Sequence, residues 1–138
     1  MRRDVSQVLV DTSAWIEFFQ APRSLCGQAV DVLLGEGRVC TTPLVMVEVI
    51  SGARDQAAFE RLRTDFRALS RLEPPADLWD TMLDARWRCK LRGITGLSIP
   101  DLIIAITARA HRVPILTRDH DFRRMQPVLD LQLVEVSH

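Results

Sequence analysis

The fold is decided by residues 97–121, which read LSIPDLIIAITARAHRVPILTRDHD. Ser98 is a typical N-cap, so an apolar helix is expected to begin there and to run up to a strand at residues 113–117. Asp101 then lies in the first turn of this helix, and Asp119 lies just beyond the strand. Both acids fall at the ends of apolar elements.

Two further acids occupy comparable positions elsewhere in the chain. Asp11 ends an apolar run at residues 8–10, and Glu48 lies inside the run LVMVEVI at residues 44–50. Because an unpaired buried charge is costly, acids in such places usually have a partner or bind a cation.

Short apolar runs alternate with helical patterns along the 138 residues, which are expected to form one domain, residues 1–138. We expect strands at residues 6–10, 38–41, 71–73, 113–117 and 131–136, and helices at residues 12–21, 24–34, 42–52, 55–69, 76–91, 98–112 and 121–125. Such alternation is typical of an α/β protein, here a three-layer α/β/α fold with a central, mostly parallel sheet. In such sheets, ligands bind outside the carboxyl ends of the strands, where Asp11 and Asp119 fall.

Each acid also has a structural explanation. The helix dipole favours Asp101, and a buried arginine could pair with Glu48. Asp11 could cap the helix that follows it, and Asp119 could shape a turn. Four separate structural explanations are less economical than a single site that all four acids share.

A shared site would need a cation. Gathered carboxylates repel one another and raise each other's pKa unless a divalent ion neutralises them. Oxygen ligands without histidine or thiolate select Mg²⁺ or Mn²⁺ over zinc. An open site of this kind suits hydrolysis of phosphodiester bonds, because the metal lowers the pKa of a bound water and screens the phosphate charge.

The ordered set of motifs resembles the PIN-domain nucleases, and more narrowly a VapC-type toxin of a bacterial type II toxin–antitoxin (VapBC) system. The resemblance extends over residues 8–136. It is carried by Asp11-Thr12-Ser13, by Glu48 in its apolar run, by Ile-Pro-Asp101 and by Leu-Thr-Arg-Asp119-His-Asp121-Phe.

The resemblance implies a PIN-like fold and an Mg²⁺- or Mn²⁺-dependent endoribonuclease that acts on RNA, with tRNA and rRNA as the classes to consider. It also implies a homodimer and inhibition by a cognate VapB-type antitoxin. The family's catalytic and metal-binding quartet falls on Asp11, Glu48, Asp101 and Asp119. Asp121 is a fifth metal ligand, through water or in place of Asp119, and the supporting hydroxyl residues are Thr12, Ser13 and Thr117.

Three other functions compete with this interpretation. A phosphatase with Asp11 as nucleophile would need a second acid two residues later, and position 13 is serine. A PIN-type RNA-processing nuclease that is not a toxin would carry the same quartet. A non-catalytic PIN-like domain that binds RNA or protein would not need it.

The composition restricts the partners. The formal net charge is zero, so RNA binding would need local positive charge. All basic residues except Lys90 are arginines, which suits phosphate binding but also follows from codon bias. The arginines nearest to Asp119 in sequence, which could hold RNA or simply face solvent, are Arg112, Arg118, Arg123 and Arg124.

The remaining sequence features concern location and surfaces. Three scattered cysteines indicate free thiols in a reducing cytoplasm, and no apolar run approaches the ~20 residues that span a membrane. Trp15, Phe18 and Phe19 suit either the core or an antitoxin groove. Trp79 and Trp87 suit the core or a dimer surface.

Overall fold

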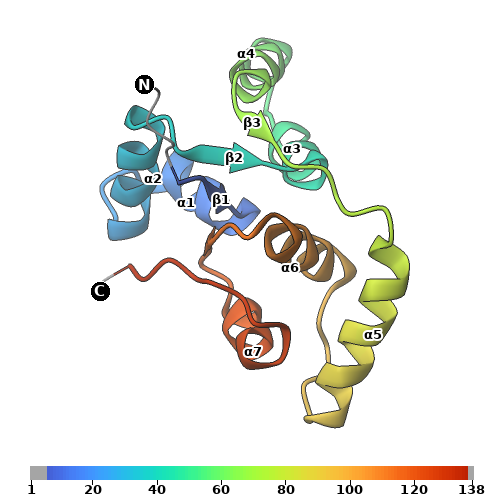
Figure 1. Cartoon of the computed structure of the whole chain (residues 1–138). Coiled ribbons are helices and arrows are strands. Elements are labelled where there is room, and N and C mark those ends of the chain that lie inside the picture. The colour runs from blue at the N-terminus through green and yellow to red at the C-terminus, as the bar shows by residue number, and fades with distance from the viewer. Residues whose placement is uncertain (1–5, 137–138) are drawn as a thin grey trace, which may run out of the picture.

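Four short strands form the central sheet of the computed structural model, which describes residues 6–136 (Figure 1). The strands are β1 (Val8–Val10), β2 (Val39–Thr41), β3 (Ser70–Arg71) and β4 (Ile115–Leu116). Their order is β3-β2-β1-β4, and every pair of neighbours is parallel. The prediction of a central, mostly parallel sheet is therefore confirmed.

The register of β1 fixes the position of the first acid. Val10 pairs with Leu116, and the backbone N–H of Asp11 donates to the Leu116 carbonyl at 2.9 Å. The residues that follow, Asp11 and Thr117, therefore come side by side at the carboxyl edge of the sheet. β1 is fully buried because helices cover both faces of the sheet.

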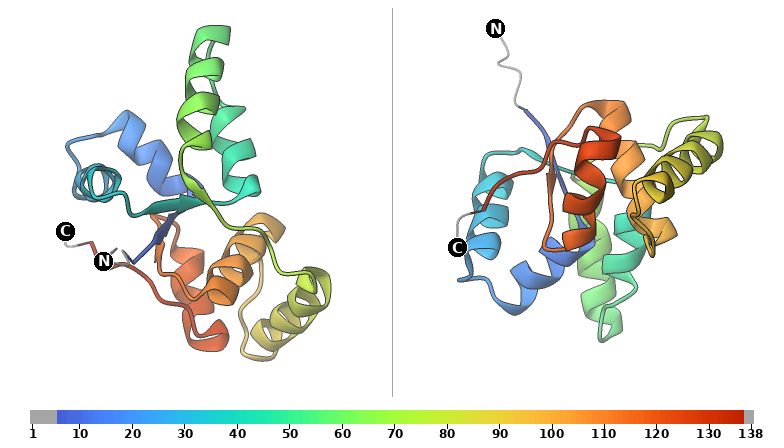
Figure 2. Two further views of the ribbon diagram at one scale, coloured as in Figure 1. Left: turned by 45° about the horizontal axis from the view of Figure 1, so that its top comes forward. Right: turned by 90° about the horizontal axis from the view of Figure 1, so that it is seen from below.

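Seven helices flank the sheet in the described residues. They are α1 (Thr12–Gln20), α2 (Leu25–Gly35), α3 (Pro43–Ile50), α4 (Gln56–Arg67), α5 (Leu78–Leu91), α6 (Ile99–His111) and α7 (His120–Leu129). Helices α1 to α4 lie on one side of the sheet and α5 to α7 on the other (Figure 2). This arrangement is the expected three-layer α/β/α fold.

The predicted helix starts follow from N-capping. The side chains of Ser24, Thr42 and Ser98 accept hydrogen bonds from the backbone N–H three residues later, as an N-cap does. The Ser98 cap receives its bond from Asp101 itself, at 3.1 Å. The cap therefore fixes the backbone from which the Asp101 carboxylate projects.

Two expectations about the C-terminal region are wrong. Residues 131–136 form only one bridge, Ile115↔Leu133, because β4 offers just two residues to pair with. Helix α7 does not stop before Pro127 but continues to Leu129. Burial of its last apolar residues outweighs the one hydrogen bond that proline removes.

One apolar core lies between the layers, and its buried members come mainly from β1, β2, β4 and all seven described helices. The three cysteines are buried and free, as expected. Among the described residues, no helix is long and apolar enough to span a membrane.

The first turn of α2 should tolerate no side chain at Gly27, which packs against the turn between α1 and α2. A Cβ there would lie 2.6 Å from the Ala21 carbonyl oxygen and 2.9 Å from the Pro22 Cα, both backbone atoms that cannot move cheaply. We expect Gly27→Ala to lower the free energy of unfolding by about 1–3 kcal/mol in urea denaturation. Gly35→Ala, where a Cβ would meet nothing within 4 Å, is the control and should be neutral or stabilising. Equal effects of the two substitutions would contradict this account.

Candidate metal centre

Three carboxylates converge at the carboxyl edge of the sheet. Asp101 comes from the first turn of α6, Asp119 follows β4, and Asp121 lies in the first turn of α7. Each offers a carboxylate oxygen, and these three oxygens lie within 4.8 Å of one another. The fold therefore brings together three of the five acids that the sequence analysis assigned to one site.

Asp11 lies beside this cluster and is almost fully buried, with 3% of its surface exposed. The hydroxyls of Ser13 and Thr117 both donate to its Oδ2, at 2.7 and 2.8 Å. Each hydroxyl has a single proton, so both protons are used in these bonds. Burial raises the pKa of Asp11, and the two hydroxyl bonds oppose that shift.

The same two hydroxyls also fix the turn after β4. Ser13 Oγ accepts the backbone N–H of Arg118 at 2.9 Å, and Thr117 Oγ1 accepts that of Asp119 at 3.0 Å. The expected supporting role of Ser13 and Thr117 thus has a definite geometry. They join Asp11 to the backbone that carries Asp119.

Asp119 has a structural role in addition to its place in the cluster. Its Oδ1 accepts the backbone N–H of Asp121 at 2.9 Å, which makes Asp119 the N-cap of α7. The turn-shaping role considered from the sequence is therefore present as well. The bond engages one carboxylate oxygen and holds the side chain at a fixed orientation.

Electrostatic strain is greatest at Asp101. Partial burial, the negative charge of Asp119 with a hydrogen bond to it, and the charge of Asp11 together raise the pKa of Asp101 to about 7. The hydrogen bond from Ser98 opposes the shift only weakly. A cation placed among these carboxylates would remove most of the repulsion.

Glu48 does not join the cluster of three. It is exposed on α3, and its Oε1 accepts a hydrogen bond from Thr12 Oγ1 at 2.8 Å. The alternative of a buried ion pair with arginine is therefore wrong. Thr12 follows Asp11 directly in the chain and begins α1, so this bond holds Glu48 near the position of Asp11.

The sequence analysis placed Arg124 near the acids but did not predict that it pairs with one of them. Arg124 donates from Nη1 to Asp121 Oδ1 at 2.9 Å and from Nη2 to the Thr95 carbonyl at 2.8 Å. The spacing of Asp121 and Arg124 by three residues within a helix was the available signal. This clamp ties the α5–α6 loop to the cluster.

The other arginines near Asp119 in sequence have different surroundings. Arg118 pairs with Glu17 at 3.3 Å, and Arg123 pairs with Glu135 at 2.9 Å. Arg112 lies at the far end of α6, about 16 Å along the helix from Asp101. Of the four arginines considered for RNA binding, Arg112 therefore lies away from the acids.

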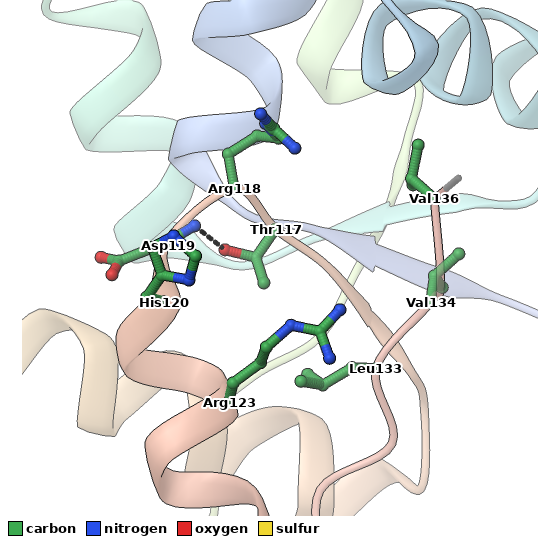
Figure 3. Close-up of a pocket in the computed structure, with 8 residues that line it drawn as sticks. All are labelled: Thr117, Arg118, Asp119, His120, Arg123, Leu133, Val134 and Val136. Carbon is green, nitrogen blue, oxygen red and sulfur yellow. Dashed lines mark hydrogen bonds between the residues drawn. The ribbon is translucent and has the colours of Figure 1, made fainter. Parts of the chain in front are cut away.

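A cavity of about 160 Å³ opens next to the cluster, between the turn after β4 and the C-terminal segment (Figure 3). Arg118, His120 and Arg123 give it a basic lining, and Leu133 and Val134 supply an apolar wall. The Asp119 carboxylate points away from Arg123 in this view. Acidic and basic surfaces thus lie on opposite sides of the same turn.

The aromatic residues of α1 do not form an open groove. Trp15 is 3% exposed and packs against Phe66 with ring centroids 4.8 Å apart. Phe18 is half-buried, and Phe19 is exposed. Of the two alternatives considered for Trp15, the core is the correct one, because Phe66 of α4 packs against its ring.

Comparison with known proteins agrees with this geometry. The family model of the PIN domain matches residues 8–126. The chain is 33% identical over 133 residues to the VapC ribonuclease Mb1587 of Mycobacterium bovis, which covers 91% of this chain and 96% of that protein. It is 30% identical over 114 residues to the ribonuclease VapC51 of Mycobacterium tuberculosis, covering 83% of this chain and 81% of that protein.

The fold also matches a solved toxin–antitoxin complex from Klebsiella pneumoniae. The TM-score is 0.70 with 25% identity, over 94% of this chain and 97% of that chain. The chain has a parallel α/β sheet with an acidic cluster at its carboxyl edge, and it matches the PIN-domain family model. It therefore belongs to the PIN-domain family. Its relatives within that family are VapC ribonucleases, so the resemblance seen in the sequence is confirmed.

The raised pKa of Asp101 predicts a pH-dependent stability in chelator. Between the ordinary aspartate pKa of 3.8 and about 7, the folded protein keeps a proton that the unfolded chain loses. Stability is therefore lost as pH rises through this range. Asp101→Asn should melt about 2–4 °C above wild type at pH 8, with solvent screening limiting the gain, and the gap should close towards pH 4.

Asp31→Asn is the matched control, since Asp31 is exposed on α2. Its melting temperature should differ from wild type by the same amount at both pH values. An Asp101→Asn gap that does not change with pH would contradict the assignment of the repulsion to this residue.

Proposed function

We propose that this protein is a Mg²⁺- or Mn²⁺-dependent endoribonuclease and the toxin of a toxin–antitoxin pair. The observation that carries the proposal is the group of three carboxylates at Asp101, Asp119 and Asp121, with their oxygens within 4.8 Å. The proposed catalytic and metal-binding residues are those expected from the sequence: Asp11, Glu48, Asp101, Asp119 and Asp121.

The chemistry of the donor set fits a hard divalent cation. Every candidate ligand is a carboxylate oxygen, the donor that Mg²⁺ and Mn²⁺ prefer. The pKa of Asp101 is raised first by burial and then by the negative charges of Asp119 and Asp11, which a bound cation would offset. The Arg124 guanidinium offsets part of this charge, but it contacts Asp121 alone among the three acids.

The ion, when bound, would lower the pKa of a water and screen the charge of the phosphodiester. The protein's own residues prepare that site. Ser13 and Thr117 hold the Asp11 carboxylate by its Oδ2, which leaves Oδ1 free of these two bonds. The N-cap bond of Asp119 and the Arg124 clamp on Asp121 restrict the other two carboxylates.

Glu48 has a separate role in this proposal. Thr12 holds the Glu48 side chain, which is exposed to solvent. Its carboxylate is therefore available to an ion or to a water molecule. Arg118 and Arg123, both exposed beside Asp119, are the basic groups placed to meet RNA phosphates. The likeness to named VapC ribonucleases favours a toxin over an RNA-processing nuclease.

The antitoxin is proposed to dock between α3 and α4 rather than at Trp15. An open groove of about 470 Å³ lies there, with an apolar floor that includes Met46, Val47 and Phe59. Its rim carries three arginines, at positions 63, 67 and 71. An amphipathic segment with acidic flanks fits this combination of an apolar groove and a basic rim.

Metal dependence gives the central test. Asp119→Asn keeps an N-cap of equal quality, so α7 should stay folded while the site loses a charged ligand. We expect Mn²⁺ binding in calorimetry and RNA cleavage to fall on the order of 100-fold, with EDTA abolishing wild-type cleavage. The exposed Asp31→Asn is the control. Cleavage by verified metal-free protein would disprove the proposed mechanism.

The docking groove has a matched pair of variants. Val47 on α3 and Val32 on α2 are both exposed valines on helix surfaces. Val47→Glu places a charge in the apolar groove and should weaken binding of the co-encoded antitoxin by about 10-fold or more, whereas Val32→Glu should not. Affinity is measured by surface plasmon resonance. Equal loss in both variants, or no loss in Val47→Glu, would reject this groove.

A further inference from the structure

The cavity between the turn after β4 and the C-terminal segment has room for one small ring. Its volume is about 160 Å³, and a protein cavity of about 150 Å³ holds one benzene molecule. Its apolar wall comes from Leu133, Val134 and Val136, each of which is half-buried. These side chains offer an aromatic group an apolar contact surface. The cavity therefore suits a single six-membered ring better than a larger fused ring.

The opposite wall of the cavity is cationic. His120 and Arg123 line it near the start of α7, and both side chains are exposed. Figure 3 shows the Arg123 guanidinium pointing towards the C-terminal segment. A ligand in the cavity would meet apolar contacts on one side and positive charge on the other. A nucleotide satisfies both sides, with its base and its phosphate.

The carboxylate of Glu135 marks the place where a phosphate would bind. Its two oxygens accept hydrogen bonds from Nη2 and Nη1 of Arg123, at 2.9 and 3.5 Å. Arginine holds a phosphate with the same two-pronged geometry. The side chains of Arg123 and Glu135 are 56% and 71% exposed, so this ion pair contributes little to stability. A ligand phosphate can therefore displace Glu135 at small cost.

Asp119 connects the cavity to the acidic cluster. It lines the cavity, and its carboxylate is one of the three that converge. The two places are thus separated by about the length of one side chain. A nucleotide in the cavity would therefore be the neighbour, on the same strand, of a phosphodiester at the cluster.

We propose that this cavity is a base-binding subsite, which takes a pyrimidine nucleotide next to the phosphodiester at the cluster. The ring lies against Leu133 and Val134, and the phosphate lies on Arg123. The inference rests on the proposed ribonuclease function and adds the residues that select the base. Phosphate contacts alone carry no sequence information, so selection needs a site that touches the base. The second ring of a purine exceeds the room available.

Titration with mononucleotides tests the subsite without requiring cleavage. Backbone amide shifts of the isotope-labelled protein are followed by NMR in EDTA, with uridine monophosphate (UMP), adenosine monophosphate (AMP), uridine or inorganic phosphate as the ligand. We expect UMP to shift the amides of residues 117–120 and 133–136. AMP should bind about 10-fold more weakly, because its second ring does not fit.

Two variants separate the base from the phosphate. Arg123→Gln removes a charge-assisted hydrogen bond, so it should weaken UMP about 10-fold and leave uridine unchanged. Arg112→Gln, at the far end of α6, is the matched control. Val134→Phe fills the cavity and should abolish uridine binding while inorganic phosphate still binds. Val32→Phe, at an exposed valine of α2, is the control for that change.

A third variant has an effect of opposite sign. Glu135→Gln removes the carboxylate that competes for Arg123, so it should strengthen UMP binding about 3-fold. Melting curves verify that each variant is folded. If Val134→Phe does not fold, the exposed Arg123→Gln and Glu135→Gln variants still decide between the outcomes.

Three results would overturn the proposal. They are equal affinity for UMP and AMP, unchanged UMP binding in Arg123→Gln, and binding of inorganic phosphate without any binding of uridine. The last result would make the cavity an anion site. A protein that binds UMP as expected but cleaves no RNA in Mn²⁺ would contradict the proposed ribonuclease and not the nucleotide site. Metal-dependent cleavage by a protein that does not distinguish UMP from AMP would contradict the subsite alone.

Discussion

The parallel pairing of β1 with β4 is the interaction on which the site depends. It joins the beginning of the chain to a segment more than a hundred residues later and sets Asp11 next to Thr117. From that one register the Ser13 and Thr117 hydroxyls reach the same carboxylate oxygen, and the turn that carries Asp119 is fixed. A shift of one residue would turn these side chains to opposite faces of the sheet.

The site is a place where folding and function conflict. Four acids lie at one edge of the sheet, and burial together with the negative charges of Asp119 and Asp11 raises the pKa of Asp101 to about 7. The fold tolerates this because each acid is also used locally: Asp11 by two hydroxyls, Asp119 as an N-cap, and Asp121 by Arg124. Apart from the Arg124 guanidinium at Asp121, these bonds hold the carboxylates close together without adding positive charge, which is what a cation-binding site requires.

Several local features could be read from sequence because their causes are local. Ser98 caps α6, Thr42 caps α3, and the spacing of Asp119 and Asp121 after a strand placed both at the start of α7. The alternation of helices and strands gave the parallel sheet, and a parallel sheet brings strand ends to one edge. Where the sequence prediction failed, at residues 131–136 and at Pro127, the outcome depended on the length of β4 and on core packing elsewhere.

The sequence by itself determined the kind of element that each acid occupies, and through the order of its motifs the family to which the chain belongs. The tertiary structure alone decided which acids meet. Asp121 lies in the cluster and Glu48 lies outside it with Thr12, although the sequence places Glu48 inside an apolar run. Likewise Trp15 is buried while Trp79 and Trp87 are exposed. Periodicity tells which residues share a face, but only the packing of distant segments determines whether that face is covered.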